Sequence, residues 1–263
     1  MELLPAVILC GGLGTRLREE TEYRPKPMVE IGGRPILWHI LRIFASQGVR
    51  DFILCLGYKG EVIRRYFLDY ETMNADVTIE LGPKKITVHD QIEECDWRVT
   101  LAETGEKAQT GARIARIRRY VEGQPFFVTY GDGLANVNLA ALLRYHRREG
   151  RLATVTAVRP WSGRFGELSL HESRVVAFKE KSLEKASNIN GGFFVFEPGV
   201  FEYLSTDDSC VLEREPLERL AAAGQLSAYR HDGFWACMDT YRDWVALNEM
   251  CERGERPWER SAR

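Results

Sequence analysis

Short apolar runs alternate with segments of helical periodicity from the start of this sequence, and that alternation limits the folds open to the chain. The run from Ala6 to Cys10 is typical of a buried strand. Apolar residues then recur at helical spacing between Pro35 and Gln47, and Gly48 follows as a helix-ending residue. A second apolar strand, Asp51 to Leu56, comes next. Strand, helix and strand in this order predict parallel strands joined by a crossover helix.

The same alternation continues along the rest of the chain. Helices are predicted at 61–70, 114–121, 139–148, 216–223 and 242–251, and strands at 77–81, 126–130, 153–158, 175–178 and 192–196. The Arg- and Glu-rich residues from Glu252 onward are predicted to form a solvated tail. We therefore expect an α/β fold in which helices cover a mainly parallel sheet, with ligands bound beyond the carboxyl ends of its strands.

Composition limits the class of protein further. The chain has 263 residues, of which 44% are hydrophobic, and this predicts one large domain with a substantial core. Its 36 Lys and Arg residues against 38 Asp and Glu give a formal net charge of −2. Nucleic acid and anionic membranes are therefore not expected as partners, and any phosphate site must be local. Six cysteines without a C-x-x-C pair or zinc-like spacing indicate a reduced, cytoplasmic protein.

A glycine-rich turn follows the first predicted strand. In Gly11-Gly-Leu-Gly-Thr-Arg16 the glycines would let backbone N–H groups approach a polyphosphate, and Arg16 would offer a forked donor to its oxygens. The spacing fits neither the dinucleotide-binding fingerprint nor the P-loop, and an ordinary strand-to-loop turn would also carry these glycines. Farther along, Lys26 lies between Pro25 and Pro27, whose fixed φ angles predict a stiff, extended segment. A lysine held in this way is suited to stabilising charge on a phosphate.

Several segments taken together resemble a known enzyme family. Gly11-Gly-Leu-Gly-Thr-Arg-Leu17 and Lys26-Pro-Met-Val-Glu-Ile-Gly-Gly33 resemble the amino-terminal signature of sugar-nucleotide pyrophosphorylases, which are sugar-1-phosphate nucleotidyltransferases. Over about residues 6 to 258, the order and spacing of further motifs resemble the glucose-1-phosphate cytidylyltransferases. These motifs are Tyr130-Gly-Asp-Gly133, Gly163-Arg-Phe-Gly166, Phe178-Lys-Glu-Lys181, Ile189-Asn-Gly-Gly-Phe-Phe-Val195, Phe234-Trp235 and Met238-Asp-Thr240.

The resemblance implies a fold and a reaction. The fold would be a Rossmann-like, three-layer α/β structure of the nucleotide-diphospho-sugar transferase type, with a mixed, mainly parallel sheet and small appended sugar-binding elements. A single domain would contain a nucleotide-binding part at about 1–135, a sugar-binding part at about 136–250 and a tail at about 252–263. The enzyme would join CTP to α-D-glucose 1-phosphate and release CDP-glucose and pyrophosphate. It would form a homo-oligomer, with Tyr66 to Met73 and the region of Trp97 as contacts, and would bind neither nucleic acid nor membrane.

The resemblance also implies roles for individual residues. Asp132 and Asp239 would ligate one Mg²⁺, an ion that prefers hard carboxylate oxygens. Each aspartate, taken alone, could also belong to a turn or a helix cap. Arg16 and Lys26 would contact the triphosphate and Lys181 the sugar phosphate, which completes the implied catalytic set. The implied nucleotide-binding residues are Leu9, Gly11, Gly12, Leu13, Gly14, Thr15, Thr104, Thr110, Gly111, Arg113 and Gly131. The implied sugar-binding residues are Glu180, Lys181, Asn190 and Gly191.

Departures from the family pattern leave alternatives open. Ala112 stands in place of the second glycine of T-G-G-R, and the pattern also differs at Glu103, Arg24 and Ser182. Since these positions lie near the base and sugar segments, another sugar or cyclitol phosphate, or dTTP or UTP, stays open as a substrate. A non-catalytic nucleotide-binding regulatory module is a rival from a different class, disfavoured by the intact Lys26 and its partner motifs. A Rossmann dehydrogenase is disfavoured because the glycine turn lacks the required spacing.

Overall fold

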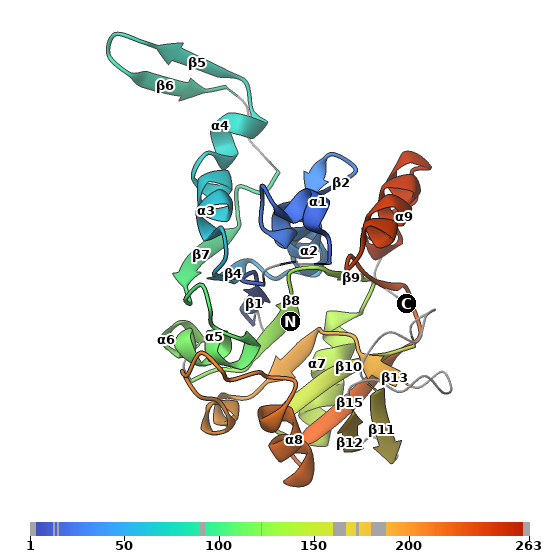
Figure 1. Ribbon diagram of the computed structural model, residues 1–263. Helices are drawn as coiled ribbons and strands as arrows, with labels where there is room; N and C mark the ends of the chain where they lie inside the picture. Colours follow the sequence, from blue (N-terminus) through green and yellow to red (C-terminus); the bar gives the residue numbers. More distant parts are fainter. Residues whose placement is uncertain are drawn as a thin grey trace.

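A ten-stranded sheet lies at the centre of the computed structural model, which describes residues 4–12, 14, 16–89, 93–121, 123–159, 167–171, 174–179 and 188–259 (Figure 1). From one edge to the other, its strands are β13 (Asn188–Asn190), β11 (Glu167–His171), β12 (Arg174–Lys179), β15 (Leu226–His231), β10 (Ala153–Val158), β14 (Phe194–Phe196), β8 (Phe126–Tyr130), β1 (Ala6–Leu9), β4 (Asp51–Leu56) and β7 (Arg98–Glu103). Strands from the first and second halves of the sequence thus belong to one continuous sheet.

Most strands of this sheet run in one direction. Strand β1 is parallel to β4 and β8, β4 is parallel to β7, and β10 is parallel to β15. Strand β14 is antiparallel to both β8 and β10, so β10 runs in the same direction as β8. It follows that β15, β10, β8, β1, β4 and β7 all share one direction. The prediction of a mixed, mainly parallel sheet is confirmed.

Helices cover both faces of the sheet. They are α1 (Arg18–Thr21), α2 (Ile36–Ala45), α3 (Gly60–Leu68), α4 (Tyr70–Asn74), α5 (Thr110–Arg116), α6 (Arg118–Val121), α7 (Leu139–Glu149), α8 (Glu215–Ala222) and α9 (Tyr241–Glu252), with 3-10 turns η1 (Lys26–Met28), η2 (Pro198–Tyr203) and η3 (Pro257–Glu259). Alternate residues of a strand face opposite sides of its sheet. Ala6 and Ile8 accordingly share a core with α2 and α7, whereas Val7 and Leu9 share a second core with α5 and α8. The predicted three-layer architecture is confirmed.

The strand predicted at 77–81 lies outside the central sheet. It forms β5 (Val77–Glu80), which pairs with β6 (Lys85–Val88) in a hairpin that projects from the body of the molecule (Figure 1). Most of β5 is exposed to solvent, so this strand does not occupy a position covered on both faces. The strand that pairs with β4 is instead β7. Its charged ends interrupt the apolar pattern, so the sequence did not predict it.

The carboxyl-terminal segment is not a solvated tail up to Glu259. Trp258 in η3 is only 1% exposed, and its ring packs edge-on against His39 with centroids 5.8 Å apart. Its other neighbour is Phe234, with ring centroids 5.7 Å apart. One buried tryptophan can remove 150–250 Å² from water, on the order of what anchors a short segment. Because the residues around Trp258 are charged, the composition of this segment predicted a solvated tail and gave no sign of the buried side chain.

Two predicted helices have different bounds from those expected. The helix at 61–70 is divided into α3 and α4 at Asp69, and the helix at 114–121 begins earlier, at Thr110, and is divided into α5 and α6 at Ile117. Within the described ranges, every helix is too short or too polar to cross a bilayer.

Candidate active site

The glycine-rich turn and the Gly131-Asp132 segment lie at the same edge of the sheet. Leu9 ends β1 and Tyr130 ends β8, and the two residues are in register in this parallel pair. The chain therefore leaves both strands at their carboxyl ends, side by side. Gly131 donates its N–H to the Leu9 carbonyl at 3.0 Å, and a Cβ at Gly131 would lie 2.8 Å from both the Leu9 oxygen and Pro27 Cγ. A side chain at position 131 would therefore separate the two segments.

A short ribbon brings Asp239 to Asp132. Strand β9 (Gly133–Ala135) pairs with β16 (Trp235–Cys237), with Gly133 opposite Cys237, and the Met238 N–H donates to the Asp132 carbonyl at 2.9 Å. Directly after Asp239, a capping box between Thr240 and Asp243 starts α9 and fixes the backbone there. The two aspartates, far apart in the sequence, are thus held at one point of the structure.

Lys26 lies between these two carboxylates. Its Nζ is 2.7 Å from Asp132 Oδ2 and 2.9 Å from Asp239 Oδ1, and Arg16 pairs with the other oxygen of Asp239. Burial acts to lower the pKa of Lys26, but the charge of Asp132, with smaller contributions from Cys237 and Asp239, holds it above its ordinary value. Burial acts to raise the pKa of Asp239, and Lys26 and Arg16 nevertheless hold it below its ordinary value. Lys26 therefore stays an ammonium and Asp239 a carboxylate near neutral pH.

The turn that carries Lys26 is stiff. Pro25 adopts φ −68° and ψ 151°, and Lys26 and Pro27 then enter the 3-10 turn η1. Pro27 and Met28 are buried, which anchors the turn on the core side while the Lys26 side chain extends toward the aspartates. The predicted rigidity of this segment is present, although the lysine begins a 3-10 turn and is not extended as expected.

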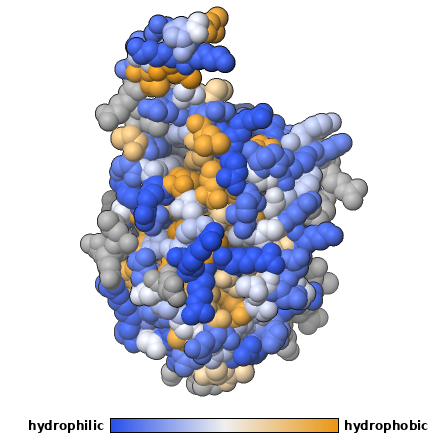
Figure 2. All heavy atoms as spheres, turned by 90° about the vertical axis from the view of Figure 1, so that its left-hand side faces the viewer, coloured by the Kyte–Doolittle hydropathy of each residue, from blue (hydrophilic) through white to orange (hydrophobic). Residues whose placement is uncertain are grey.

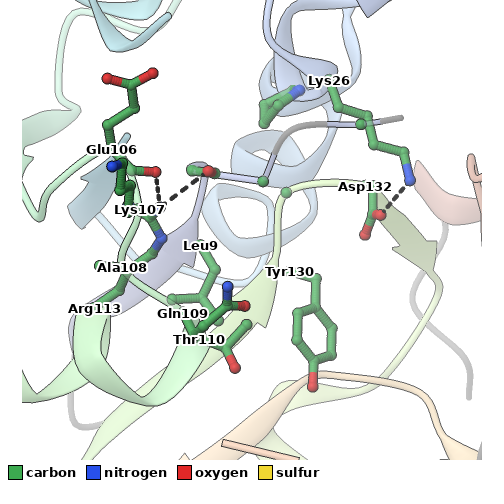
Figure 3. A pocket seen from close by; sticks show the side chains of 15 residues that line it. Leu9, Lys26, Glu106, Lys107, Ala108, Gln109, Thr110, Arg113, Tyr130 and Asp132 are labelled. Carbon is green, nitrogen blue, oxygen red and sulfur yellow. Dashed lines mark hydrogen bonds and ion pairs between the residues drawn. The ribbon is translucent and has the colours of Figure 1, made fainter. Parts of the chain in front are cut away.

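A cavity of about 540 Å³ opens beside this cluster (Figure 3). Lys26 and Asp132 form one side, and the segment Glu106 to Thr110 forms the opposite side, with Leu9 and Tyr130 between them. Of the expected nucleotide-binding residues, the lining includes Leu9, Gly11, Gly12, Gly14, Thr110, Arg113 and Gly131. Its size and position at the strand ends suit a nucleotide. Glu106 to Gln109 carry no motif, so the sequence did not single them out as part of the wall.

Arg113 lines this cavity, whereas Thr104, also expected to bind the nucleotide, is buried behind Arg113 and is not among the described residues of the lining. Arg113 is 3% exposed, and its guanidinium donates to the carbonyls of Leu56 and Gly11 at 2.8 and 3.0 Å. It also donates to Thr104 Oγ1 at 2.8 Å, while the Thr104 hydroxyl itself donates to the Leu56 carbonyl at 2.5 Å. A Cβ on Gly11 would lie 2.0 Å from Arg113 Cζ, so the guanidinium occupies the space a side chain would need. These contacts shape the glycine-rich turn.

The remaining expected positions fall into three groups. Gly111 faces away from the cavity, because a Cβ there would lie 2.7 Å from Cys210 Sγ. Asn190 lies at the end of β13 and donates from Nδ2 to the Tyr130 hydroxyl at 2.8 Å, and Gly191 packs where a Cβ would meet Val158 Cγ1 at 2.7 Å. Four expected residues lie outside the described part of the chain: Leu13, Thr15, Glu180 and Lys181.

The donor atoms at this site fit Mg²⁺. Asp132 and Asp239 both reach the single ammonium of Lys26, so their oxygens lie within reach of one common cation. Across the described ranges no cluster of three or more His, Cys, Asp or Glu side chains could hold a metal by itself. Mg²⁺ is commonly bound through one or two carboxylates together with water and substrate phosphates. Burial and the nearby Asp132 raise the pKa of the Cys237 thiol, so this sulfur is not a thiolate ligand.

Comparison with known proteins shows the family to which the chain belongs. The sequence profile of the family described as nucleotidyl transferase matches residues 5–245. The chain belongs to the nucleotidyl transferase family. A glucose-1-phosphate cytidylyltransferase from Salmonella typhimurium is 46% identical over 97% of this chain and 98% of that protein. A probable glucose-1-phosphate cytidylyltransferase from Bacillus subtilis is 45% identical over 97% of this chain and 99% of that protein.

Solved structures resemble this nucleotidyltransferase in fold. The crystal structure of HddC from Yersinia pseudotuberculosis, complexed with GMP-PN, superposes with a TM-score of 0.75 over 94% of this chain and 99% of that one, at 24% sequence identity. At that identity the likeness concerns the fold alone. It agrees with the predicted nucleotide-diphospho-sugar transferase architecture.

Besides the segment Glu106 to Gln109, the sequence assigned no role to Tyr130 or Glu213 in this nucleotidyltransferase site. Tyr130 lines the cavity, and its hydroxyl donates to Glu213 Oε1 at 2.5 Å. The other carboxylate oxygen of Glu213 accepts from Thr110 Oγ1 at 2.6 Å. The position of Tyr130 at a strand end next to Gly131 could have indicated it. Glu213 stands in a charged stretch without a motif, so no local signal marks it.

Proposed function

We propose that this nucleotidyltransferase condenses CTP with α-D-glucose 1-phosphate to give CDP-glucose and pyrophosphate. The observation that carries the proposal is the convergence of Asp132, Asp239 and Lys26 beside a cavity lined by the glycine-rich turn. The choice of base and sugar is supported by two relatives, named as a glucose-1-phosphate and a probable glucose-1-phosphate cytidylyltransferase, that are 46% and 45% identical to the chain.

In the proposed reaction, an oxygen of the sugar phosphate forms a bond to the α-phosphorus of CTP. The bond from that phosphorus to the oxygen of the β-phosphate breaks, and its electron pair leaves with pyrophosphate. The attacking phosphate is already ionised near neutral pH, with a second pKa of about 6 for a phosphate monoester, so no general base is needed. The residues of the chain have to orient the two anions and stabilise the charge that moves between them.

The cationic residues are assigned to different phosphates. Lys26 and Arg16 would bind the triphosphate, because both pair with Asp239 near the glycine-rich turn. Backbone N–H groups of Gly12 and Gly14 line the same cavity and would donate to phosphate oxygens. Lys181 is proposed to bind the sugar phosphate, with Glu180, Asn190 and Gly191 on the sugar.

Asp132 and Asp239 would hold Mg²⁺ together with the phosphates. When bound, the ion would supply positive charge to the reacting phosphates and link the nucleotide to the sugar phosphate. Asp239 remains a carboxylate near neutral pH because Lys26 and Arg16 lower its pKa, so the oxygen is ready to ligate without losing a proton. The Lys26 ammonium, which is close to both carboxylates, would contribute positive charge at the same point.

We also propose a cytoplasmic, homo-oligomeric protein. All six cysteines lie in the described part of the chain and are free thiols, which suits a reducing compartment. Large apolar side chains on the projecting hairpin and on α3 and α4 are exposed, among them Leu68, Met73 and Leu81. Exposed apolar groups of this kind are typical of contact surfaces.

The function is tested by measuring pyrophosphate release from CTP, UTP, dTTP and ATP against a panel of sugar 1-phosphates, with the product identified by mass. CTP with glucose 1-phosphate is expected to give the highest kcat/KM and a product of the mass of CDP-glucose. A higher kcat/KM with UTP or dTTP would show that the assignment of the base is wrong. Activity that persists after chelation of divalent ions would show that the assignment of Mg²⁺ is wrong.

A further inference from the structure

Glu213 joins three residues that belong to different parts of the site. Its two carboxylate oxygens accept from the Thr110 and Tyr130 hydroxyls, at 2.6 and 2.5 Å. Thr110 and Tyr130 line the proposed nucleotide cavity, whereas Glu213 is not among the described residues of that lining. Asn190, proposed to contact the sugar, donates to the same Tyr130 hydroxyl at 2.8 Å. A continuous chain of hydrogen bonds therefore runs from Thr110 through Glu213 and Tyr130 to Asn190.

The direction of each hydrogen bond in this chain is fixed by the carboxylate. An ionised carboxylate only accepts hydrogen bonds, so the Tyr130 hydroxyl must give its single proton to Glu213. The Tyr130 oxygen is then left to accept, and it accepts from the amide nitrogen of Asn190. The amide oxygen of Asn190 accepts from the Gly192 N–H at 2.9 Å, which agrees with this orientation. Because an amide has two N–H donors, Asn190 can direct the second toward a sugar hydroxyl.

The backbone around Glu213 is tied to the start of α5. The Gln109 N–H donates to the Asp208 carbonyl at 2.9 Å, and the Ala112 N–H donates to the Cys210 carbonyl at 3.1 Å. The Leu212 N–H in turn donates to Thr110 Oγ1 at 2.9 Å. These bonds hold the loop that carries Glu213 against the helix that borders the cavity. The carboxylate thus has a fixed position behind the wall of the site.

We propose that Glu213 is a positioning residue that orients Asn190 for the sugar phosphate by fixing the proton of Tyr130. The proposal rests on the proposed function of the site. Glu213 touches neither reactant, and it acts through Tyr130. A carboxylate next to the proposed nucleotide cavity thereby sets the orientation of Asn190, which is proposed to contact the sugar.

The first test is Glu213→Gln, which keeps the shape of the side chain and replaces one acceptor oxygen by a donor. If the new amide nitrogen faces Tyr130, it donates to the tyrosine oxygen and the tyrosine proton turns toward Asn190. The side-chain amide of Asn190 must then turn over so that its oxygen accepts this proton. If the new nitrogen instead faces Thr110, Tyr130 keeps its acceptor, so Glu213→Leu, which removes both acceptor oxygens, is measured beside Glu213→Gln. We expect the KM for glucose 1-phosphate to rise by roughly three- to tenfold in Glu213→Leu, as for loss of one hydrogen bond between uncharged groups, with a smaller change in the KM for CTP. Glu215→Gln, on the exposed side of α8 and paired with Arg219 at 3.5 Å, is the matched control and should leave both values unchanged.

The second test is a double-mutant cycle with Tyr130→Phe, which removes the hydroxyl that links Glu213 to Asn190. Tyr130→Phe alone should raise the KM for glucose 1-phosphate, and Glu213→Gln should then add little, because both act through one hydrogen-bond chain. Independent, multiplying effects, or a sugar KM unchanged in both Glu213→Gln and Glu213→Leu, would overturn the proposal. Thermal unfolding of each variant separates loss of folding from loss of orientation. If the wild-type protein makes no CDP-glucose, the proposed function fails; if it does and both Glu213 variants match it, only the role of Glu213 fails.

Discussion

At the residue scale, Lys26 shares one ammonium between two carboxylates that arrive from different elements. Its pKa is held above the ordinary value mainly by Asp132 in spite of burial, so the group stays protonated well beyond neutral pH. We expect Lys26→Met to lower kcat by roughly 30- to 1,000-fold, the effect of losing a hydrogen bond to developing charge in a site shielded from water. Lys181→Ala should instead raise the KM for the sugar phosphate. Steady-state kinetics with each substrate varied in turn separates the two effects.

The matched control for Lys26→Met is Lys85→Met, which removes the same charge from the projecting hairpin, where Lys85 is 3.8 Å from Glu80. This variant should retain the wild-type kcat. If Lys26→Met changed only the KM for the sugar phosphate, the assignment of this lysine to the nucleotide would be wrong.

Asp239 gives a second prediction at the same scale. Asp239→Asn keeps the size of the side chain but removes the charge that Lys26, Arg16 and the proposed ion share. We expect activity to fall by more than about 100-fold and the Mg²⁺ concentration for half-maximal activity to rise, because one of two protein ligands is weakened. Asp96→Asn, which removes an exposed carboxylate paired with Arg50, serves as the control. An unchanged metal requirement in Asp239→Asn would contradict the assignment.

The buried His39 is expected to make the stability of the folded protein depend on pH. Its Nε2 lies 2.8 Å from the Ile31 carbonyl, and Trp258 Nε1 is 3.4 Å from its Nδ1, so the ring is neutral and uses both nitrogens. Burial lowers the pKa of His39, opposed by the hydrogen bond to Ile31 and assisted by the charge of Arg256. A folded-state pKa below the unfolded value of about 6.5 means that the contribution is complete above that pH and is lost as the pH falls through the folded-state pKa.

The expected outcome is a melting temperature that declines as the pH is lowered from about 6.5 toward 5. His39→Gln, which places an uncharged amide near the Ile31 carbonyl, should show a shallower decline than the wild-type protein. His146 and His231 also have pKa values lowered by burial and should retain part of the slope. Parallel curves for the two proteins would exclude His39 as a source of the pH dependence.

At the element scale, the sequence predicted the elements that are buried on both faces. β1, β4, β8 and β10 are largely apolar, with buried threonines in β8 and β10, because the helical layers cover both sides of them, and their bounds were predicted within a residue. β7 and β15 were missed, since charged residues at their ends shorten the apolar run. The apolar β5 was assigned to the wrong sheet. Local pattern thus predicts burial more reliably than it predicts strand neighbours.

Some residues of the site are positioned by local motifs that the sequence shows, and others by long-range contacts that it does not show. The glycine-rich turn and the Lys26 turn follow from short motifs, because glycine and proline fix backbone geometry locally. The placing of Asp132 and Asp239 on one lysine depends on the β9–β16 ribbon, whose strands are three residues each and carry no local signal. The Glu213 contacts depend on the loop docking against α5, which no sequence pattern describes. Non-local pairing therefore completes the site.

The 3-10 turn η3 provides a test at the scale of an element. Trp258 is the anchor of this turn and is 1% exposed. We expect Trp258→Ala to lower the free energy of unfolding by about 3–5 kcal/mol, the usual cost of truncating a buried tryptophan. Tyr23→Ala, at a 76% exposed ring, should stay within about 0.5 kcal/mol of wild type. Chemical denaturation measures both, and equal stabilities would show that the segment is peripheral to the core.

At the scale of the whole molecule, the sheet brings the two proposed substrate sites together. β8 and β1 end at the proposed nucleotide cavity, and Asn190 at the end of β13 donates to Tyr130 at the end of β8. β13 pairs with β10 as well as with β11, so it lies near β8 although it stands at the other end of the strand order. The formal net charge of −2 provides no global attraction for anions, so the binding of the two proposed substrates would depend on the local cations Lys26 and Arg16.

Most of the large apolar side chains that are exposed in the described part of the chain belong to α3, α4 and the projecting hairpin, and they predict self-association there. Figure 2 shows hydrophobic residues on the face below the projecting hairpin, where a groove of about 450 Å³ is lined by residues that include Phe67, Leu68, Trp97 and Leu101. Leu81 at the tip of the hairpin is 84% exposed. A single Leu side chain is worth about 1.5–3 kcal/mol when buried, so several of them can hold copies of the chain together.

Light scattering after gel filtration is therefore expected to give a mass that is a multiple of 30.1 kDa. Leu68→Glu combined with Leu81→Glu should shift the population toward the single chain, because each introduces a charge where an apolar contact is expected to form. Tyr23→Glu, at an exposed ring outside the hairpin and groove, should leave the mass unchanged. A wild-type protein that runs at 30.1 kDa over a wide concentration range would contradict the homo-oligomer, and a double variant of unchanged mass would place the interface on another face. Since closed symmetric assemblies use the same patch on every copy, two substitutions in one chain alter every contact at once, which makes the shift large enough to measure.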